Sequence, residues 1–129
     1  MEDRPIVIDH VSRVVYAEAR GEPYVGKLAV AWVVKNRFNK GGYGNNIGEI
    51  TREKQFSKWR KPIDDEKAWK ECIRAAEEVF YGDRTDPAGG ATHFYSGSDE
   101  PSWVNGEKPV VEIGGHKFFN NIDKQQKFK

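Results

Sequence analysis

The sequence contains a single cysteine, Cys72, among its 129 residues. One cysteine cannot form an internal disulfide, and it cannot supply the set of thiolates that a cysteine-based zinc site requires. Long apolar runs are also absent, since no stretch approaches the roughly 20 apolar residues of a membrane-spanning helix. The N-terminal segment MEDRPIVIDH lacks the apolar core of a secretory leader, which predicts synthesis in the cytoplasm without a signal peptide.

A surplus of either charge is missing as well. Lys and Arg number 21 and Asp and Glu number 20, which gives a net charge of +1. A dedicated nucleic-acid binder would carry a basic surplus, so we expect no nucleic-acid partner. The C-terminal KQQKFK is locally basic, and its shortness favours a solvated tail. The chain is nevertheless 12% aromatic, which predicts one folded domain over residues 1–129.

Hydrophobic periodicity predicts that the first two thirds of the chain are helical. Asp9 and Asp64 stand where N-cap residues are preferred, and Gly21 and Gly82 stand where a helix would end. We expect long helices at roughly Val11–Arg20, Tyr24–Phe38 and Asp65–Tyr81, and a short helix near Ile47–Arg52.

The last third of the chain carries a β pattern. Strands are expected at Ala91–Ser96, Val110–Ile113 and His116–Phe119. Gly114 and Gly115 separate the last two apolar runs, as in a two-residue hairpin. The predicted fold is α+β, mainly helical with a small antiparallel β element near the C-terminus.

Glu18 is the residue that points to chemistry. It shares one helical face with Val11, Val14 and Val15. Burial on such a face favours the neutral form of a carboxyl group, and a neutral acid can protonate a glycosidic leaving oxygen. The alternative is a structural ion pair between Glu18 and Arg13, Arg20 or Arg37.

The other chemical candidates are weaker. The three histidines, His10, His93 and His116, lack the spacing of a helical metal site, so no metal is expected. Cys72 lies among Ala and Ile on a helix face, which is typical of a core residue. No serine lies in a G-x-S-x-G elbow.

Aromatic and amide side chains outside the long helices fit a sugar-binding groove, although most of the aromatics would also fit a hydrophobic core. The aromatic set is Tyr43, Trp59, Phe94, Tyr95 and Trp103, and the amides are Gln55, Asn105 and Asn120.

Four motifs resemble those of one family. The run YAEARGEPYVGKLAVAWVVKNRF, Tyr16–Phe38, closely resembles the opening motif of the spore cortex-lytic enzyme family of bacterial cell-wall hydrolases, which also includes phage endolysins. Its later Q-F-S, D-P-T-G-G-A and I-G-x-H elements are matched in order by Gln55-Phe56-Ser57, by DPAGGATHFYS at Asp86–Ser96 and by IGGHKFF at Ile113–Phe119. The resemblance covers a core of about residues 8–120.

This resemblance implies a lysozyme-like catalytic domain that acts on peptidoglycan glycan strands. The expected reaction is cleavage of the β-1,4 bond between N-acetylmuramic acid and N-acetylglucosamine by a lytic transglycosylase, without a cofactor. Glu18 matches the catalytic acid of the family. We expect the substrate-binding residues to be Gln55, Phe56, Tyr95, Trp103, His116 and Glu22, with Gln55, Phe56 and Tyr95 facing the same groove as Glu18.

The sequence also departs from the family pattern. Phe119 stands where tyrosine is common, and His93 occupies a variable position. Many members carry a signal peptide and a separate peptidoglycan-binding domain, and neither is recognisable here. This difference favours a monomeric phage lysin released by another protein, or a single-domain enzyme, that reaches the cell wall after release or export.

Other reaction types stay open at this point. A hydrolytic muramidase would use a second carboxylate, for which Glu22, Glu49, Glu53 and Asp86 are candidates. A glycan-binding module would need the aromatics without the acid. A peptidoglycan amidase or endopeptidase normally uses zinc or a cysteine nucleophile, and the sequence disfavours both.

Overall fold

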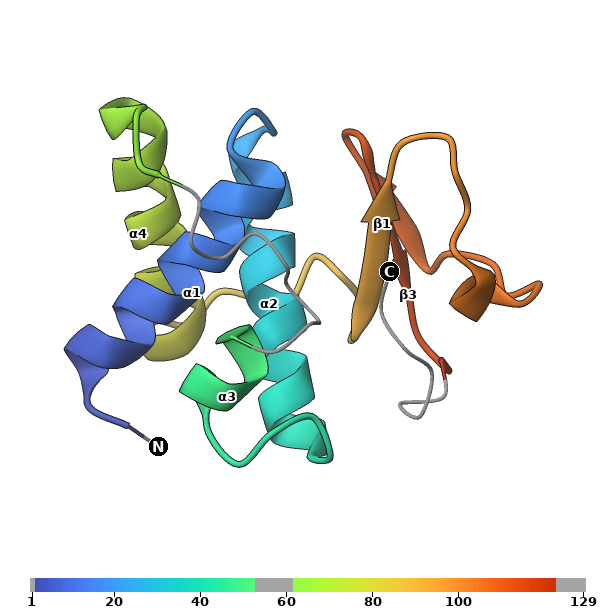
Figure 1. The fold of residues 1–129 in the computed structure, drawn as a ribbon, viewed down its shortest axis with the longest axis horizontal. Coiled ribbons are helices and arrows are strands. Elements are labelled where there is room, and N and C mark those ends of the chain that lie inside the picture. Colours follow the sequence, from blue (N-terminus) through green and yellow to red (C-terminus); the bar gives the residue numbers. More distant parts are fainter. Residues whose placement is uncertain (1, 53–61, 123–129) are drawn as a thin grey trace.

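The computed structural model describes residues 2–52 and 62–122. Gln55, Phe56, Ser57, Trp59 and Glu53 lie outside the described residues. The helices are α1 (Arg4–Ala19), α2 (Tyr24–Lys40), α3 (Ile47–Arg52) and α4 (Glu66–Tyr81), followed by β1 (His93–Ser96), the 3-10 helix η2 (Ser102–Val104), β2 (Val111–Ile113) and β3 (His116–Phe119). Figure 1 shows the helices gathered on one side and the strands on the other.

Helix α1 begins seven residues before the predicted start, at Arg4 rather than Val11. Pro5 lies in its first turn, where the missing N–H costs no helical hydrogen bond. Asp9 is therefore inside the helix, where it accepts a 3.0 Å hydrogen bond from Arg13 instead of capping the N-terminus.

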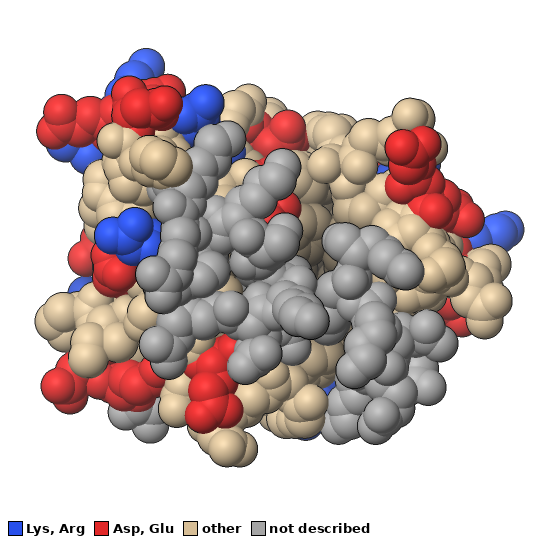
Figure 2. All heavy atoms as spheres, in the orientation of Figure 1, with Lys and Arg blue, Asp and Glu red and all other residues tan. Residues whose placement is uncertain are grey.

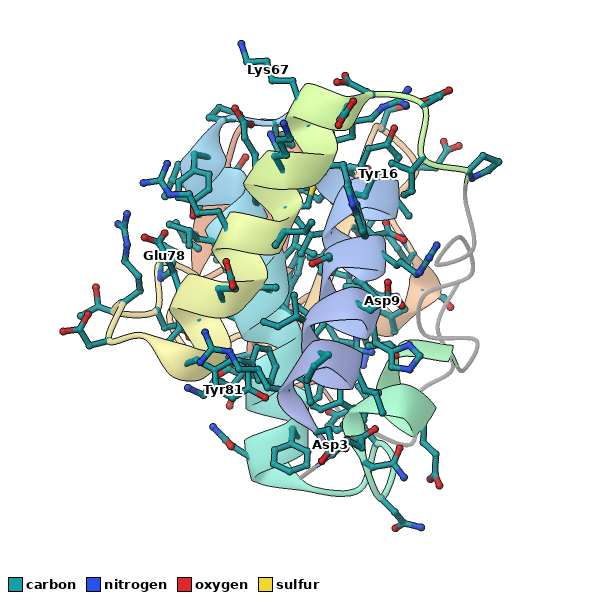
Figure 3. All side chains as sticks on the ribbon, turned by 90° about the vertical axis from the view of Figure 1, so that its left-hand side faces the viewer. Asp3, Asp9, Tyr16, Lys67, Glu78 and Tyr81 are labelled. Atoms are coloured by element: carbon teal, nitrogen blue, oxygen red, sulfur yellow. The ribbon has the colours of Figure 1, made fainter. Side chains whose placement is uncertain are left out.

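The N-cap of α4 is Asp65, one residue after the predicted Asp64. The Asp65 side chain accepts a 3.0 Å hydrogen bond from the backbone N–H of Ala68. Asp64 instead accepts a 2.8 Å hydrogen bond from the hydroxyl of Tyr16, and it also pairs with Arg20. A tertiary contact from α1 thus decides which of two adjacent acids caps the helix. Figure 3 shows α1 and α4 side by side, with Tyr16 near the far end of α1 from Asp3.

The hydrophobic core lies where α2 packs against the other three helices. Its fully buried residues include Val11, Val14 and Val15 of α1, Val30, Val33 and Val34 of α2, and Cys72, Ala75 and Ala76 of α4. Small side chains on α4 allow the helices to approach closely. None of the described helices combines the length and apolarity of a membrane span.

The strands form one antiparallel sheet in the order β1-β3-β2. The predicted hairpin is present: Ile113 pairs with His116, and Gly114 adopts a φ of +57° in the turn. Phe118 pairs with Phe94 and Val111 on the face that joins the helical core. Side chains alternate along a strand, so the other face carries Tyr95 and Phe119, which pack with η2.

Candidate functional site

Glu18 lies in the final turn of α1, next to the turn that leads into α2, and its side chain is half-buried. The backbone N–H of Glu22 donates a 3.0 Å hydrogen bond to the carbonyl of Ala19, so the chain continues this turn beyond the helix end. The acid is therefore held on regular backbone at one end of the helical layer, which is a rigid base for a reacting group.

Arg37 of α2 is a basic residue whose charge interacts with Glu18. Its side chain is 2% exposed, and its Nε donates a 2.6 Å hydrogen bond to the carbonyl of Thr92. Burial lowers the pKa of Arg37 to about 9, and the charges of Tyr43 and Glu18 oppose that shift. Arg37, one of the arginines considered from the sequence, thus shares an electrostatic environment with Glu18.

The other two arginines have different partners. Arg13 binds Asp9 at 3.0 Å within α1, and the guanidinium of Arg20 donates to the hydroxyl of Tyr16 at 2.9 Å and pairs with Asp64. Figure 2 shows acidic and basic side chains together on the helical side of the molecule, in agreement with the balanced composition.

His93 extends this buried polar region into the sheet. Its ring is fully buried between the rings of Tyr43 and Trp103. The centroid of the His93 ring lies 6.1 Å from that of Tyr43 and 5.1 Å from that of Trp103. Burial, followed by the charges of Arg37 and Lys40, lowers the pKa of His93 to about 3, so the imidazole is neutral near pH 7. The Oγ1 of Thr92 lies 3.0 Å from its Nδ1.

Sequence reasoning considered Arg37 only as a possible ion-pair partner of Glu18, and it left the role of His93 open. The available signal was the position of Arg37 in the N-R pair that closes the first motif, together with the position of His93 inside the DPAGGATHFYS segment. Neither pattern shows that the two motifs meet at the start of β1.

Tyr95 and Trp103 form an aromatic cluster on the outer face of the sheet. The Tyr95 ring stacks on Phe119 with centroids 5.7 Å apart, and it meets Trp103 edge-on at 6.1 Å. Lys117 lies over the same ring at 5.8 Å from its centroid. Trp103 is 3% exposed, so it supports Tyr95 and presents little surface of its own.

His116 lies on the opposite face of the sheet from Tyr95. Its ring contacts Phe94 at 5.3 Å and Phe118 at 6.0 Å between centroids, and only 4% of the residue is exposed. The structure therefore does not bring Tyr95 and His116, two of the expected substrate-binding residues, onto one face of the sheet. Adjacent strand positions of β3, Lys117 and His116, point to opposite sides.

Glu22 forms a hydrogen bond with the β2–β3 hairpin. Its Oε1 accepts a 2.9 Å hydrogen bond from the backbone N–H of Gly115 and lies 3.6 Å from Nδ1 of His116. Gln55 and Phe56, the remaining expected substrate ligands, lie outside the described residues. A substrate role for Glu22, Tyr95, Trp103 and His116 stays a prediction.

Within residues 2–52 and 62–122, no three His, Cys, Asp or Glu side chains come together as a potential metal site. Cys72 is fully buried, and burial raises its pKa to about 12, which leaves the thiol protonated at neutral pH. These observations give no described cysteine the exposed thiolate that a nucleophile requires.

Comparison with known proteins finds a matching family model and several similar sequences. A family model described as Cell Wall Hydrolase matches residues 21–119, a span that begins three residues after Glu18. The spore cortex-lytic enzyme of Halalkalibacterium halodurans is 34% identical over 88% of this chain, and that of Bacillus subtilis is 30% identical over 84%. This chain spans about a third of the length of these relatives, 34% and 35% respectively.

Two solved structures are also similar. The catalytic domain of the Bacillus cereus SleB protein matches with a TM-score of 0.72 and 26% identity, covering 92% of this chain and 93% of that domain. The catalytic domain of the germination-specific lytic transglycosylase SleB from Bacillus anthracis matches with a TM-score of 0.71, also at 26% identity, covering 92% of this chain and 97% of that domain. These matches confirm the predicted lysozyme-like α+β fold.

Proposed function

Because this chain belongs to the cell wall hydrolase family, as its motifs predicted, we propose that it cleaves the glycan strands of peptidoglycan. The bond that we assign to it is the β-1,4 linkage between N-acetylmuramic acid and N-acetylglucosamine. The reaction that we favour is that of a lytic transglycosylase, with Glu18 as acid and then as base.

The observation that carries this proposal is the position of Glu18. It is a half-buried carboxyl group in the last turn of α1, on the helix face that otherwise packs into the core. A half-buried carboxyl group is partly shielded from bulk water and still partly accessible. General acid–base groups are commonly found in such environments.

The proposed cleavage uses one carboxyl group twice. Glu18 donates its proton to the glycosidic oxygen as the bond from that oxygen to C1 of the muramic acid breaks. The resulting carboxylate then takes the proton from the 6-hydroxyl of the same sugar, whose oxygen forms the new bond to C1. The products are a 1,6-anhydromuramic end and a free 4-hydroxyl on the released glucosamine, and Glu18 returns to its protonated form.

Hydrolysis would usually require a second carboxylate to activate water or to act as nucleophile. Glu22, Glu49 and Asp86 are the described candidates from the sequence. Glu22 accepts a 2.9 Å hydrogen bond from the backbone N–H of Gly115, and Glu49 accepts a 3.0 Å hydrogen bond from the backbone N–H of Asn45. Asp86 accepts 2.7 Å hydrogen bonds from the backbones of two glycine-rich-turn residues. Each of the three carboxylates accepts a hydrogen bond from the backbone, which favours the single-carboxylate reaction.

Mass spectrometry of peptidoglycan digested by the purified chain tests the assignment. We expect fragments with 1,6-anhydromuramic ends. Reducing muramic ends would identify a hydrolytic muramidase instead, and cut stem peptides would identify an amidase or endopeptidase. The absence of any fragment, with glycan binding retained, would identify a binding module.

We also propose that the site of action is the cell wall, reached after release or export. A compact phage endolysin and a single-domain bacterial enzyme both fit this proposal. Two experiments separate access to the cell wall from catalytic activity. In one, the purified protein is added to susceptible cells from outside; in the other, it is expressed inside a host together with a membrane-permeabilising protein. The extent of lysis is compared between them.

A further inference from the structure

The carboxylate of Glu22 joins the turn between α1 and α2 to the tip of the β2–β3 hairpin. Its Oε1 lies 2.9 Å from the backbone nitrogen of Gly115, which is 93 residues later in the sequence. The same oxygen lies 3.6 Å from Nδ1 of His116. Only 22% of the Glu22 side chain is exposed, so most of it is committed to this contact.

Two glycines leave the room that this carboxylate occupies. A Cβ on Gly114 would lie 2.0 Å from Oε1 of Glu22, which is far inside van der Waals contact. A Cβ on Gly26 would lie 3.1 Å from the Cβ of Glu22 and 3.7 Å from Ile113 of the hairpin. The glycines of two distant motifs, E-P-x-x-G and I-G-G-H, therefore both accommodate the same side chain.

Groups on both sides hold the contact in place. The ammonium of Lys27, which is 3% exposed, donates a 2.6 Å hydrogen bond to the carbonyl of Glu22 and lies 3.1 Å from Glu71 of α4. On the hairpin side, the His116 ring packs between Phe94 and Phe118. The backbone of Glu22 is thus fixed to α4, and its carboxylate is fixed to the core face of the sheet.

Glu22 is also connected directly to the last turn of α1. Its N–H donates to the carbonyl of Ala19 at 3.0 Å, and Ala19 follows Glu18. A displacement of the hairpin relative to this turn would therefore change the distance between Glu18 and the sheet. Errors of about 1 Å in the placement of reacting groups can cost on the order of 100-fold in rate.

We propose that Glu22 is a positioning residue that keeps the β2–β3 hairpin at a fixed position relative to the last turn of α1, which carries Glu18. This inference rests on the proposed catalytic function of Glu18. It assigns Glu22 a role other than the substrate contact expected from the sequence, because its carboxylate oxygen already accepts from Gly115 and faces His116.

The test compares Glu22→Ala with Glu22→Gln, because the Gln carbonyl oxygen can still accept from Gly115. Glu112→Ala is the matched control, since Glu112 is an exposed carboxylate on β2 outside this contact. Two quantities are measured for each variant: the exchange rate of the Gly115 amide by NMR, and kcat and KM on solubilised peptidoglycan strands.

For Glu22→Ala we expect at least tenfold faster exchange at Gly115 and a kcat lowered about 10- to 100-fold, with KM within about twofold of wild type. Glu22→Gln and Glu112→Ala should stay within about threefold of wild type in kcat. Partial rescue by Gln distinguishes positioning from a general loss of structure. If Glu22→Ala does not fold, Glu22→Asp gives the same comparison, because its shorter side chain withdraws the acceptor from Gly115.

A raised KM with unchanged kcat would overturn the proposal and identify Glu22 as a substrate ligand. Unchanged exchange at Gly115 in Glu22→Ala would overturn it as well. If the wild-type chain released no glycan fragments, the proposed function would fail, while the exchange rates would still report whether Glu22 holds the hairpin.

Discussion

Arg37 donates a 2.6 Å hydrogen bond from Nε to the backbone carbonyl of Thr92, across 55 residues of sequence. Arg37 lies near the end of α2, and Thr92 immediately precedes β1. The neighbouring Asn36 donates a 3.0 Å hydrogen bond to the carbonyl of Ala91. The N-R pair of the first motif thus attaches the entry of the sheet to the helical layer, beside Glu18.

We predict that Arg37→Met lowers the free energy of unfolding by about 1–3 kcal/mol, because a buried carbonyl loses its donor. Guanidinium denaturation measures this change. Arg13→Met is the control: the pair of Arg13 with Asp9 is partly exposed, so its loss should cost less than about 1 kcal/mol. Equal effects of the two substitutions would contradict the structural role of Arg37.

Glu18→Gln should keep the fold and remove nearly all lytic activity. Gln has the same shape as Glu and cannot transfer a proton, and general acid–base catalysis contributes about 10²- to 10⁴-fold in rate. Release of muropeptides measures the loss, and circular dichroism reports the fold. Glu49→Gln serves as the control, since Glu49 accepts a backbone hydrogen bond from Asn45 that the Gln carbonyl oxygen can still accept. Activity above a tenth of wild type would rule out Glu18 as the acid.

Folding stability should depend on His93 below pH 6.5. The pKa of His93 falls from 6.5 to about 3 in the folded chain, first because of burial and then because of Arg37 and Lys40. Between these values the unfolded chain binds a proton that the folded chain excludes. The contribution is complete above pH 6.5 and is lost as the pH falls towards 3.

Denaturation curves at a series of pH values, for wild type and for His93→Gln, measure this effect. The wild-type stability should fall more steeply than that of the variant, by up to about 1.4 kcal/mol per pH unit. Around pH 8 the difference in stability between the two proteins should no longer change with pH. Parallel curves from pH 8 to pH 4 would show that His93 does not titrate between the two states.

Tyr95→Phe should lower activity more than stability. The variant keeps the ring that stacks on Phe119 and meets Trp103, and loses only a hydroxyl that can bond a sugar. One hydrogen bond of about 0.5–1.5 kcal/mol corresponds to roughly a 2- to 10-fold loss in rate.

Tyr24→Phe is the matched control for Tyr95→Phe. The hydroxyl of Tyr24 donates a hydrogen bond to Glu78 on α4. This variant should therefore lose about 0.5–1.5 kcal/mol of folding stability, the value of one hydrogen bond, and keep its activity. Wild-type activity in Tyr95→Phe would remove Tyr95 from the substrate-binding set.

The helices and the hairpin could be predicted because their signals are local. Apolar spacing identified α2 and α4 closely, the weakly patterned α3 was expected at its observed bounds, and Gly114-Gly115 identified the turn between β2 and β3. The missed first turns of α1 also had a local signal, since Asp3 and Pro5 are favourable at a helix start. The short η2 helix had no comparable pattern.

The sequence by itself determined the α+β order of elements, the family motifs and the prominence of Glu18, because periodicity and motif spacing are properties of neighbouring residues. The tertiary structure alone decided which motif residues meet. It paired Arg37 with Thr92 and Glu22 with Gly115, and it placed Tyr95 and His116 on opposite faces of the sheet. Such contacts join residues 55 and 93 positions apart, and they depend on how helices and strands pack rather than on local preference.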